Sequence, residues 1–377
     1  MTFFVQSGRV KGETEERVYV NKKVTLRDVA QLAGVSVATA SYVLNRSEKQ
    51  HISKETRARV RDAARQLNYM PNMSAKSLKS NRSACIGVAI DKDVTIPRYA
   101  QALQGIRQVL QESGYQLMLY STQVLRGEYP DYITSYFART IDGVIYIGAD
   151  NKGIPSRMRE LILRQSIPLV AFDCGGDSDI VSVDLDYFAG AREMVLFMME
   201  KGLRRIHYLR PGFDNRQERL REQGVLRAVF EHPEVDLILH RLEFYHGRAN
   251  MQIFQNNFSQ EEKEHFYEYA ASIWKCVSGF REDLRDRNDV GIICSWGAME
   301  QHVLAALGDI FPKPPVAVLA QGVLYPGSYP NLYYSELPNF EAGCTCAREI
   351  LALLENPEHS AHIMLKPGCH SQTPQCV

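Results

Sequence analysis

Apolar residues recur at helical spacing in three short segments near the start of the chain. The first apolar face consists of Leu26, Val29, Ala30 and Ala33. It follows a capping-box-like helix start at Thr25 and ends at Gly34. Ser36 caps a second predicted helix over Val37–Leu44, and Ser53 caps a third. Two short helices across a tight glycine turn, closed by a third helix, predict a small all-α helix-turn-helix head.

Beyond residue 83 buried strands alternate with amphipathic helices. The predicted strands are Cys85–Ile90, Gln116–Tyr120, Gly143–Ile147, Leu169–Phe172, Val181–Val183, Ile206–Leu209 and Val290–Cys294. The predicted helices are Tyr99–Glu112, Tyr187–Lys201, Arg221–Phe230 and Met299–Leu307. This alternation predicts an α/β body with parallel sheets and helices on both faces. Roughly 290 residues exceed one doubly wound sheet, so we expect two lobes with a cleft between them.

Three other segments differ from this pattern. Residues 1–23 are polar and have no hydrophobic period, which predicts a flexible extension. Residues 243–289 are polar, aromatic-rich and mostly helical in pattern, as in an insertion or an expanded helical region. Residues 71–83 begin with Pro71 and contain few large apolar residues, among them Leu78. So short a helix is marginal in water, so we expect a linker that becomes helical only when DNA and a partner subunit support it.

The predicted domains are therefore a flexible extension (1–23), a helix-turn-helix domain (24–70), a hinge (71–83) and a two-lobed body (84–377). Charge separates these parts. The whole chain is neutral, with 44 Lys and Arg against 44 Asp and Glu. Residues 1–83 hold 16 basic and 7 acidic residues, a net charge of +9, which leaves −9 for the rest. A basic head on an acidic body is typical of a nucleic-acid-binding protein.

Composition argues against several other classes of protein. No apolar run approaches the roughly 18 residues of a membrane span, and no export signal opens the chain, so a soluble cytoplasmic protein without a membrane partner is expected. The eight cysteines are scattered through the chain, which favours reduced thiols over a disulfide framework, and they lack the paired spacing of a zinc site. Phosphate-loop, nucleophile-elbow, zinc-protease and dinucleotide-binding motifs are absent from the sequence, so neither an enzyme, a metal nor a cofactor is predicted.

Four short motifs in the head occur in a specific order: VTLRDVAQLAGVSVATASYVLN (24–45), SKETR (53–57), LNYMPN (67–72) and AKSL (75–78). This part of the chain resembles the lactose-repressor (LacI/GalR) family of bacterial transcription regulators. More loosely, IGV (86–88), IDGVI (141–145), DYFAGA (186–191) and Arg221 with Gly224 resemble the family's periplasmic-binding-protein-like effector domain. The resemblance implies a repressor that binds a near-palindromic operator in double-stranded DNA as a homodimer, with a tetramer as the alternative. It also implies a nucleoid-associated protein and a body that binds an effector and dimerises.

The second helix of the head is expected to read DNA bases. A helix fits the major groove, and the residues that reach base edges lie on its exposed N-terminal face. Val37, Ala38 and Tyr42 match the family positions that do so. They predict thymine-methyl contacts from the two apolar residues and a hydrogen bond or stacking contact from the phenol. The alternative is that Tyr42 only packs on the surface of the domain.

Phosphate contacts are expected from short polar side chains at helix starts and along the groove edge. The residues that match family phosphate contacts are Thr25, Ser36, Thr39, Ser41 and Asn45, and His51 is a further candidate. Ordinary helix capping explains Thr25 and Ser36 equally well. In the hinge, Leu78 is expected to wedge into a minor-groove step beside Asn72, Ala75 and Lys79, as the family's hinge leucine does. The alternative is that Leu78 packs onto the body.

The predicted effector site departs from the family pattern. Arg221 matches the family's ligand-binding arginine, and Asp186 occupies an acidic position near the cleft. Two polar ligand positions are replaced, one by Ser295-Trp296 and one near Gln321. Trp296 either stacks on a sugar or fills the cleft. A sugar or sugar derivative, a different small molecule, a protein coregulator and no ligand at all remain open, as does the remote alternative of a binding protein without a DNA role.

Overall fold

The computed structural model describes residues 24–44, 52–70, 82–124, 127–148, 153–176, 179–212, 214–242, 260–297, 299–308, 310–321 and 331–371, with only the backbone for 260–266 and Gln321. The chain divides into two compact units, Met1–Asn81 and Arg82–Val377. We call them the head and the body.

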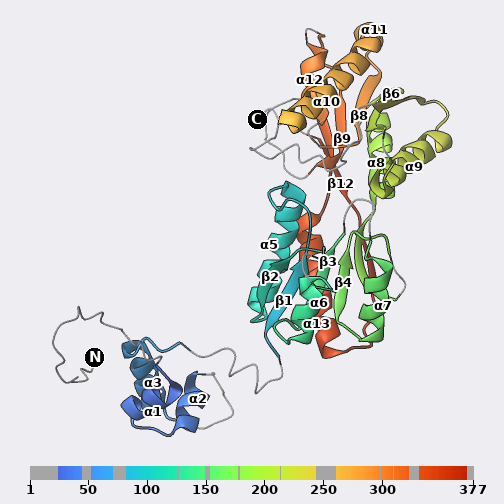
Figure 1. The fold of residues 1–377 in the computed structure, drawn as a ribbon. Helices are drawn as coiled ribbons and strands as arrows, with labels where there is room; N and C mark the ends of the chain where they lie inside the picture. Colours follow the sequence, from blue (N-terminus) through green and yellow to red (C-terminus); the bar gives the residue numbers. More distant parts are fainter. Residues whose placement is uncertain are drawn as a thin grey trace, which may run out of the picture. The chain divides into compact units, whose positions relative to one another are not determined.

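The described part of the head consists of α1 (Leu26–Ala33), α2 (Val37–Leu44) and α3 (Lys54–Gln66) (Figure 1). Thr25 and Asp28 form the predicted capping box, because each side chain accepts a hydrogen bond from the other residue's backbone N–H. Gly34 ends α1 with a φ of 63°, a left-handed conformation that glycine adopts at little cost. Ser36 and Ser53 accept hydrogen bonds from the third residues after them, at 3.1 and 3.2 Å. The predicted helix starts are therefore confirmed.

Small residues form the core of the head. Those buried are Val29, Ala30, Ala33, Ala40, Val43, Val60, Ala63 and Ala64. Because no side chain in this core is larger than valine, the three helices approach one another closely. Leu26, Val35, Leu67 and Tyr69 pack around its edge.

The body contains two lobes, each built around a six-stranded sheet. The sheet of the N lobe has the order β11-β5-β4-β3-β1-β2, and all its strand pairs are parallel. Its strands are β1 (Cys85–Ala89), β2 (Gln116–Tyr120), β3 (Gly143–Ile147), β4 (Leu169–Phe172), β5 (Val181–Leu185) and β11 (His362–Leu365). Helices α5 (Pro97–Glu112) and α13 (Asn339–Glu355) pack on one face, and α6 (Asp131–Phe137) and α7 (Ser156–Arg164) on the other.

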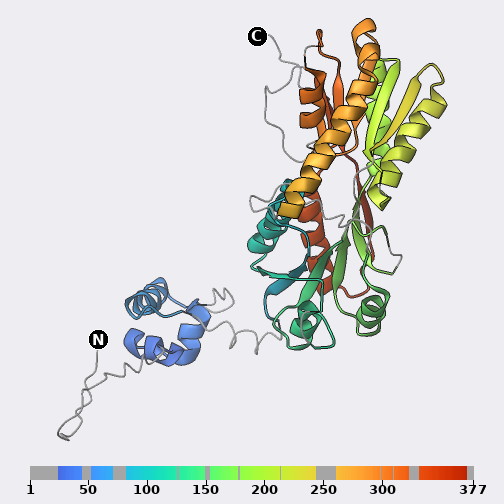
Figure 2. The same ribbon diagram turned by 45° about the horizontal axis from the view of Figure 1, so that its top comes forward.

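The sheet of the C lobe has the order β12-β10-β9-β8-β6-β7. Its strands are β6 (Arg205–Pro211), β7 (Asp236–Leu242), β8 (Val290–Cys294), β9 (Val316–Gln321), β10 (Leu332–Glu336) and β12 (Gly368–Ser371). One face carries α8 (Tyr187–Glu200) and α9 (Arg216–Glu231). The other carries α10 (Gln260–Gly279), α11 (Arg281–Asp286) and α12 (Met299–Leu307), drawn in orange in Figure 2.

The chain crosses between the lobes three times within the described residues. It leaves the N lobe after β5 to enter α8, returns from β10 to α13, and leaves again between β11 and β12. Figure 1 shows α13, drawn in red, among the blue and green elements of the N lobe. Side chains at the ends of β4 and β5 therefore lie near the helices that begin the C lobe.

The predicted fold class is confirmed, with two corrections. Strand β12 is antiparallel to β10, so the C-lobe sheet is not entirely parallel. The helix predicted over Arg221–Phe230 begins five residues earlier, because the side chain of Asn215 accepts a hydrogen bond from the N–H of Glu218 at 2.7 Å and caps it. Helices α10 and α11 supply the helical structure expected within residues 243–289, of which residues 243–259 lie outside the described part of the chain.

Candidate DNA-binding head and interlobe site

Helix α2 has an exposed face without charged residues. Val37 is 44% exposed and Tyr42 is 38% exposed, and Ala38 is exposed as well. Ala40 and Val43 on the same helix are buried in the core of the head. The three residues predicted to read bases therefore lie on the surface, while the opposite face of α2 packs against α1 and α3.

Two of the predicted phosphate contacts act as helix caps. Thr25 donates a hydrogen bond from its hydroxyl to Asp28 at 2.8 Å and accepts one from the Asp28 N–H. The Ser36 hydroxyl lies 2.9 Å from the Thr39 hydroxyl and accepts from the Thr39 N–H. Thr25 and Ser36 are exposed, and Thr39 and Ser41 are half-buried. Capping and exposure coexist here, so these hydroxyl groups are accessible to a phosphate while they stabilise their helices.

The remaining predicted DNA contacts lie outside the described residues. They are Asn45 and His51 in the head and Asn72, Ala75, Leu78 and Lys79 in the hinge. Their roles stay predictions. Within the described residues, α3 adds the exposed basic side chains of Arg59 and Arg61, which the sequence analysis did not single out.

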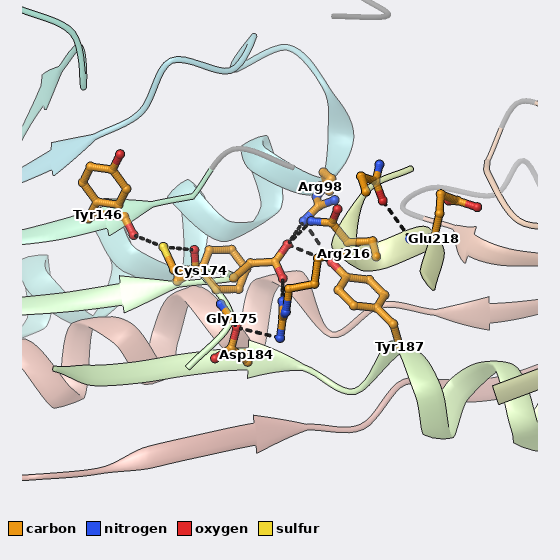
Figure 3. Close-up of polar contacts among 12 residues, drawn as sticks. Arg98, Tyr146, Cys174, Gly175, Asp184, Tyr187, Arg216 and Glu218 are labelled. Atoms are coloured by element: carbon orange, nitrogen blue, oxygen red, sulfur yellow. Dashed lines mark hydrogen bonds and ion pairs between the residues drawn. The ribbon is translucent and has the colours of Figure 1, made fainter. Parts of the chain in front are cut away.

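In the body, a buried carboxylate joins the two lobes. Asp173 directly follows β4 of the N lobe, and its side chain is 2% exposed. Its Oδ2 atom accepts hydrogen bonds from Arg98 Nη2 at 2.6 Å, the Tyr187 hydroxyl at 2.8 Å and Gln217 Nε2 at 3.2 Å (Figure 3). Its Oδ1 atom accepts one from Arg216 Nη1 at 3.3 Å. Both oxygens are therefore occupied by donors from this chain.

Arg216 contacts a second carboxylate of the N lobe. Its Nη2 atom lies 3.5 Å from Oδ1 of Asp184 on β5, and the same oxygen accepts a hydrogen bond from the Gly175 N–H at 3.0 Å. Burial raises the pKa of Asp184 above its ordinary value, although this hydrogen bond and Arg216 lower it. Arg216 on α9 thus pairs with carboxylates at the ends of two neighbouring strands.

Arg221, the predicted effector-binding arginine, is buried and already paired. Its side chain is 3% exposed, and its Nη1 atom lies 2.5 Å from Oε1 of Glu218, which is fully buried. Its guanidinium lies over the ring of Tyr187, 4.7 Å from the centroid. Burial raises the pKa of the Tyr187 hydroxyl, so that group stays protonated and donates its hydrogen bond to Asp173.

The other predicted effector residues lie apart from this pair or have local roles. Asp186 caps α8, since its Oδ1 atom accepts a hydrogen bond from the Ala189 N–H at 2.9 Å. Trp296 is half-buried against the core formed with α10 and α12, on the opposite face of the C-lobe sheet from α9 and Arg221. Gln321 ends β9, and its side chain lies outside the description. Whether these residues bind an effector stays a prediction.

Comparisons with known proteins agree on the type of protein. Residues 25–72 match the family model described as bacterial regulatory proteins, lacI family. Catabolite control protein A of Staphylococcus xylosus is 31% identical over 180 residues, which cover 48% of this chain and 53% of the relative. The HTH-type transcriptional repressor PurR of Mannheimia succiniciproducens is 30% identical over 214 residues, which cover 55% of this chain and 61% of the relative. The head of the chain therefore carries a lacI-family domain, and about half of the chain is similar to family members.

The fold extends this similarity along almost the whole chain. The crystal structure of the lac repressor dimer bound to operator and the anti-inducer ONPF superposes with a TM-score of 0.68, at 20% identity, over 93% of this chain and 99% of that one. In sequence, the chain spans about half the length of the curated relatives that it matches. Lactose-repressor-family proteins are transcription regulators rather than enzymes. None of the helices in the described ranges is long and apolar enough to cross a membrane.

The sequence analysis missed the residues that join the lobes, namely Arg98, Asp173, Asp184, Arg216 and Gln217. One signal was present. Asp173 follows a buried parallel strand, and in open α/β sheets ligands bind beyond the carboxyl ends of the strands. No pattern in the sequence, however, pairs Asp173 with Arg98, which lies 75 positions away.

Proposed function

We propose that this protein is a sequence-specific DNA-binding transcriptional repressor that acts as a dimer on a near-palindromic operator. One observation carries the proposal: within the segment that matches the lacI family model, α2 exposes Val37, Ala38 and Tyr42 while Ala40 and Val43 fix it to the core. The excess of basic residues in the first 83 positions supports the proposal, because Lys and Arg side chains that bind phosphates release the counterions condensed on the DNA.

The exposed face of α2 defines what kind of base contact is available. An α-helix about 10 Å wide enters a major groove about 12 Å wide. Val37 and Ala38 offer methyl groups, which suit the thymine methyl, and Tyr42 offers one hydroxyl for a hydrogen bond. Since this face carries no arginine, the bidentate contact to guanine is not expected from it. Each half-site is therefore expected to contain at least one adenine-thymine base pair where α2 enters the major groove.

A dimer places two heads on successive major grooves, and the hinge segments meet at the centre. Leu78 would wedge into the minor groove there, with Asn72, Ala75 and Lys79 beside it. Thr25, Ser36 and Thr39 would position the head on the phosphates. The lac repressor structure named above is a dimer bound to operator, which supports this arrangement for the present chain.

A small molecule bound between the lobes, a sugar or sugar derivative, is the effector that the family suggests. A second candidate is a regulator whose interlobe site takes no sugar and which responds to a protein coregulator or to no ligand. The paired state of Arg221 and the four donors on Asp173 favour this second candidate. A thermal-shift screen of sugars against the full-length protein separates the two, since a bound ligand raises the melting temperature.

Selection from randomised duplexes with the full-length protein tests the DNA-binding proposal. We expect a near-palindromic consensus. Tyr42→Phe should alter base preference at one position per half-site, because it removes one hydroxyl and retains the ring. Tyr267→Phe is the matched control, an exposed tyrosine of α10 in the body (69% exposed), and it should leave the consensus unchanged.

Salt dependence provides the second measurement. A dimer that contacts many phosphates should show a steep fall of log affinity with log salt concentration. A slope of log affinity against log salt concentration near zero, or a selection that returns no consensus, would contradict the DNA-binding proposal. An unchanged consensus for Tyr42→Phe would remove only the base-reading role of Tyr42.

A further inference from the structure

Asp173 receives donors from both lobes. Arg98 belongs to α5 of the N lobe, whereas Tyr187, Arg216 and Gln217 lie in the first turns of α8 and α9, which pack on the C lobe. The positive ends of these two helices therefore lie close to a buried negative charge. Figure 3 shows the side chains of Arg98, Arg216 and Tyr187 converging there. One carboxylate thus connects three separate elements across the boundary between the lobes.

Donors of this chain occupy both oxygens of the carboxylate. Three donors on Oδ2 and one on Oδ1 compensate for the loss of water around a charge that is 2% exposed. A sugar hydroxyl that reached Asp173 would compete with these donors for the same carboxylate. All four of these donors come from this chain.

The local backbone is adapted to this arrangement. Asp173 has a φ of 55°, in the left-handed region that aspartate and asparagine tolerate better than most residues. Gly175 has a φ of 95°, and a Cβ atom at that position would lie 3.0 Å from Nε of Arg216. The segment after β4 therefore places a carboxylate against α8 and α9 and leaves room for the Arg216 side chain.

We infer that Arg98, Asp173, Tyr187, Arg216 and Gln217 form an interlobe latch that keeps the two lobes together without a bound effector. In a protein whose lobes close on a ligand, the ligand makes the contacts between the lobes, whereas here side chains make them. A molecule that breaks these contacts separates the lobes, which changes the spacing of the two hinges in a dimer. This regulatory consequence rests on the proposed function, whereas the latch itself does not.

The latch is tested on the full-length protein without DNA or ligand. Asp173→Asn keeps the shape and the left-handed backbone but removes the charge. Hydrogen exchange of the backbone amides at the start of α9 should become about tenfold faster or more, because the opening of the lobes exposes them. The radius of gyration from X-ray scattering should increase. The matched control is Asp179→Asn, which removes a carboxylate paired with Arg159 inside the N lobe at 2.5 Å, and it should match the wild type.

Arg216→Gln is a second variant, and it should disturb folding less than Asp173→Asn does. Its side chain is 26% exposed, and its removal leaves Asp173 with three donors, so the variant should fold even if Asp173→Asn does not. We expect faster exchange at the same amides. The effect of the double variant should be smaller than the sum of the two single effects, because both substitutions remove the pair of Arg216 with Asp173 and only Arg216→Gln also removes the pair with Asp184.

The inference is wrong if Asp173→Asn and Arg216→Gln both exchange and scatter like Asp179→Asn, or if their effects simply add. If Asp173→Asn does not fold, the inference is overturned when the amides of Arg216→Gln exchange at the same rate as those of Asp179→Asn. These measurements involve no DNA. A protein that opens in the variants but selects no operator would keep the latch and lose the proposed function, and the reverse result would lose only the latch.

Discussion

The head and the body use polar side chains in opposite ways. In the head, the capping hydroxyl groups of Thr25 and Ser53 are exposed and bond within three positions along the chain, to Asp28 and Thr56. In the body, Asp173 is buried, and its partners lie between 14 and 75 positions away. An exposed hydroxyl exchanges water for a phosphate at little cost, whereas a buried charge must be compensated by the protein itself. The head therefore offers its polar groups to a partner, and the body satisfies its own.

The buried ion pair of the body provides the strongest test of this contrast. Arg221→Ala should lower the free energy of unfolding of the body by about 3 to 5 kcal/mol, because it leaves Glu218 charged and fully buried with its 2.5 Å partner removed. Urea denaturation of the full-length protein measures the loss.

The same helix supplies the control. Arg227 pairs with Glu231 at 2.8 Å, but its side chain is 54% exposed, so Arg227→Ala should change the midpoint little. Equal losses in the two variants would show that burial does not decide the strength of these pairs.

The same contrast explains how far the sequence predicts the structure. The helices of the head follow from local signals: the capping residues Thr25, Ser36 and Ser53 and the left-handed Gly34 each act within a few positions. In the body, buried runs such as Gly143–Ile147 and Leu169–Phe172 predict strands with the observed bounds, because fully buried parallel strands are continuously apolar.

What the sequence did not predict depends on long-range packing. Helix α13 follows the C-lobe strand β10 but packs in the N lobe, and no local pattern indicates that return. Arg221 was singled out as a ligand-binding residue, yet it pairs with Glu218 one turn earlier on α9, and the sequence does not show that both side chains are buried. The latch is likewise invisible, because Arg98, Asp173 and Arg216 come from three separate elements.

The body, unlike the described part of the head, also contains a buried histidine, His207, which packs against the half-buried His240. His207 on β6 and His240 on β7 stack with ring centroids 5.2 Å apart, and their Nδ1 and Nε2 atoms lie 2.9 Å apart. Burial lowers the pKa of His207 to about 4, assisted by His240 and Arg205, although Asp283 at 3.4 Å opposes the shift. Burial also lowers the pKa of His240. Both rings are therefore neutral in the folded body.

Because the folded pKa lies below the unfolded value near 6.5, the unfolded chain binds more protons in acid. The stability from neutral His207 is complete above pH 6.5 and decreases as the pH falls toward 4, by about 1 to 2 kcal/mol at pH 5. Urea midpoints at pH 7 and pH 5 measure this. His207→Phe should reduce the difference, whereas His232→Gln should retain it, because the side chain of His232 is 37% exposed. A difference that persists in His207→Phe would assign the acid sensitivity to other groups.

The smallest expected effect separates capping from DNA binding in the head. Thr25→Ala and Ser53→Ala each remove a side-chain cap, and each should cost about 1 kcal/mol of head stability, measured by hydrogen exchange at the amides of its core. Only Thr25 is also a predicted phosphate contact. Thr25→Ala should therefore weaken operator and random duplexes alike by a few-fold more than Ser53→Ala, because phosphate contacts carry no base specificity. If the two variants bind DNA equally, Thr25 is a cap alone, and the polar groups offered by the head are fewer than its exposed hydroxyls indicate.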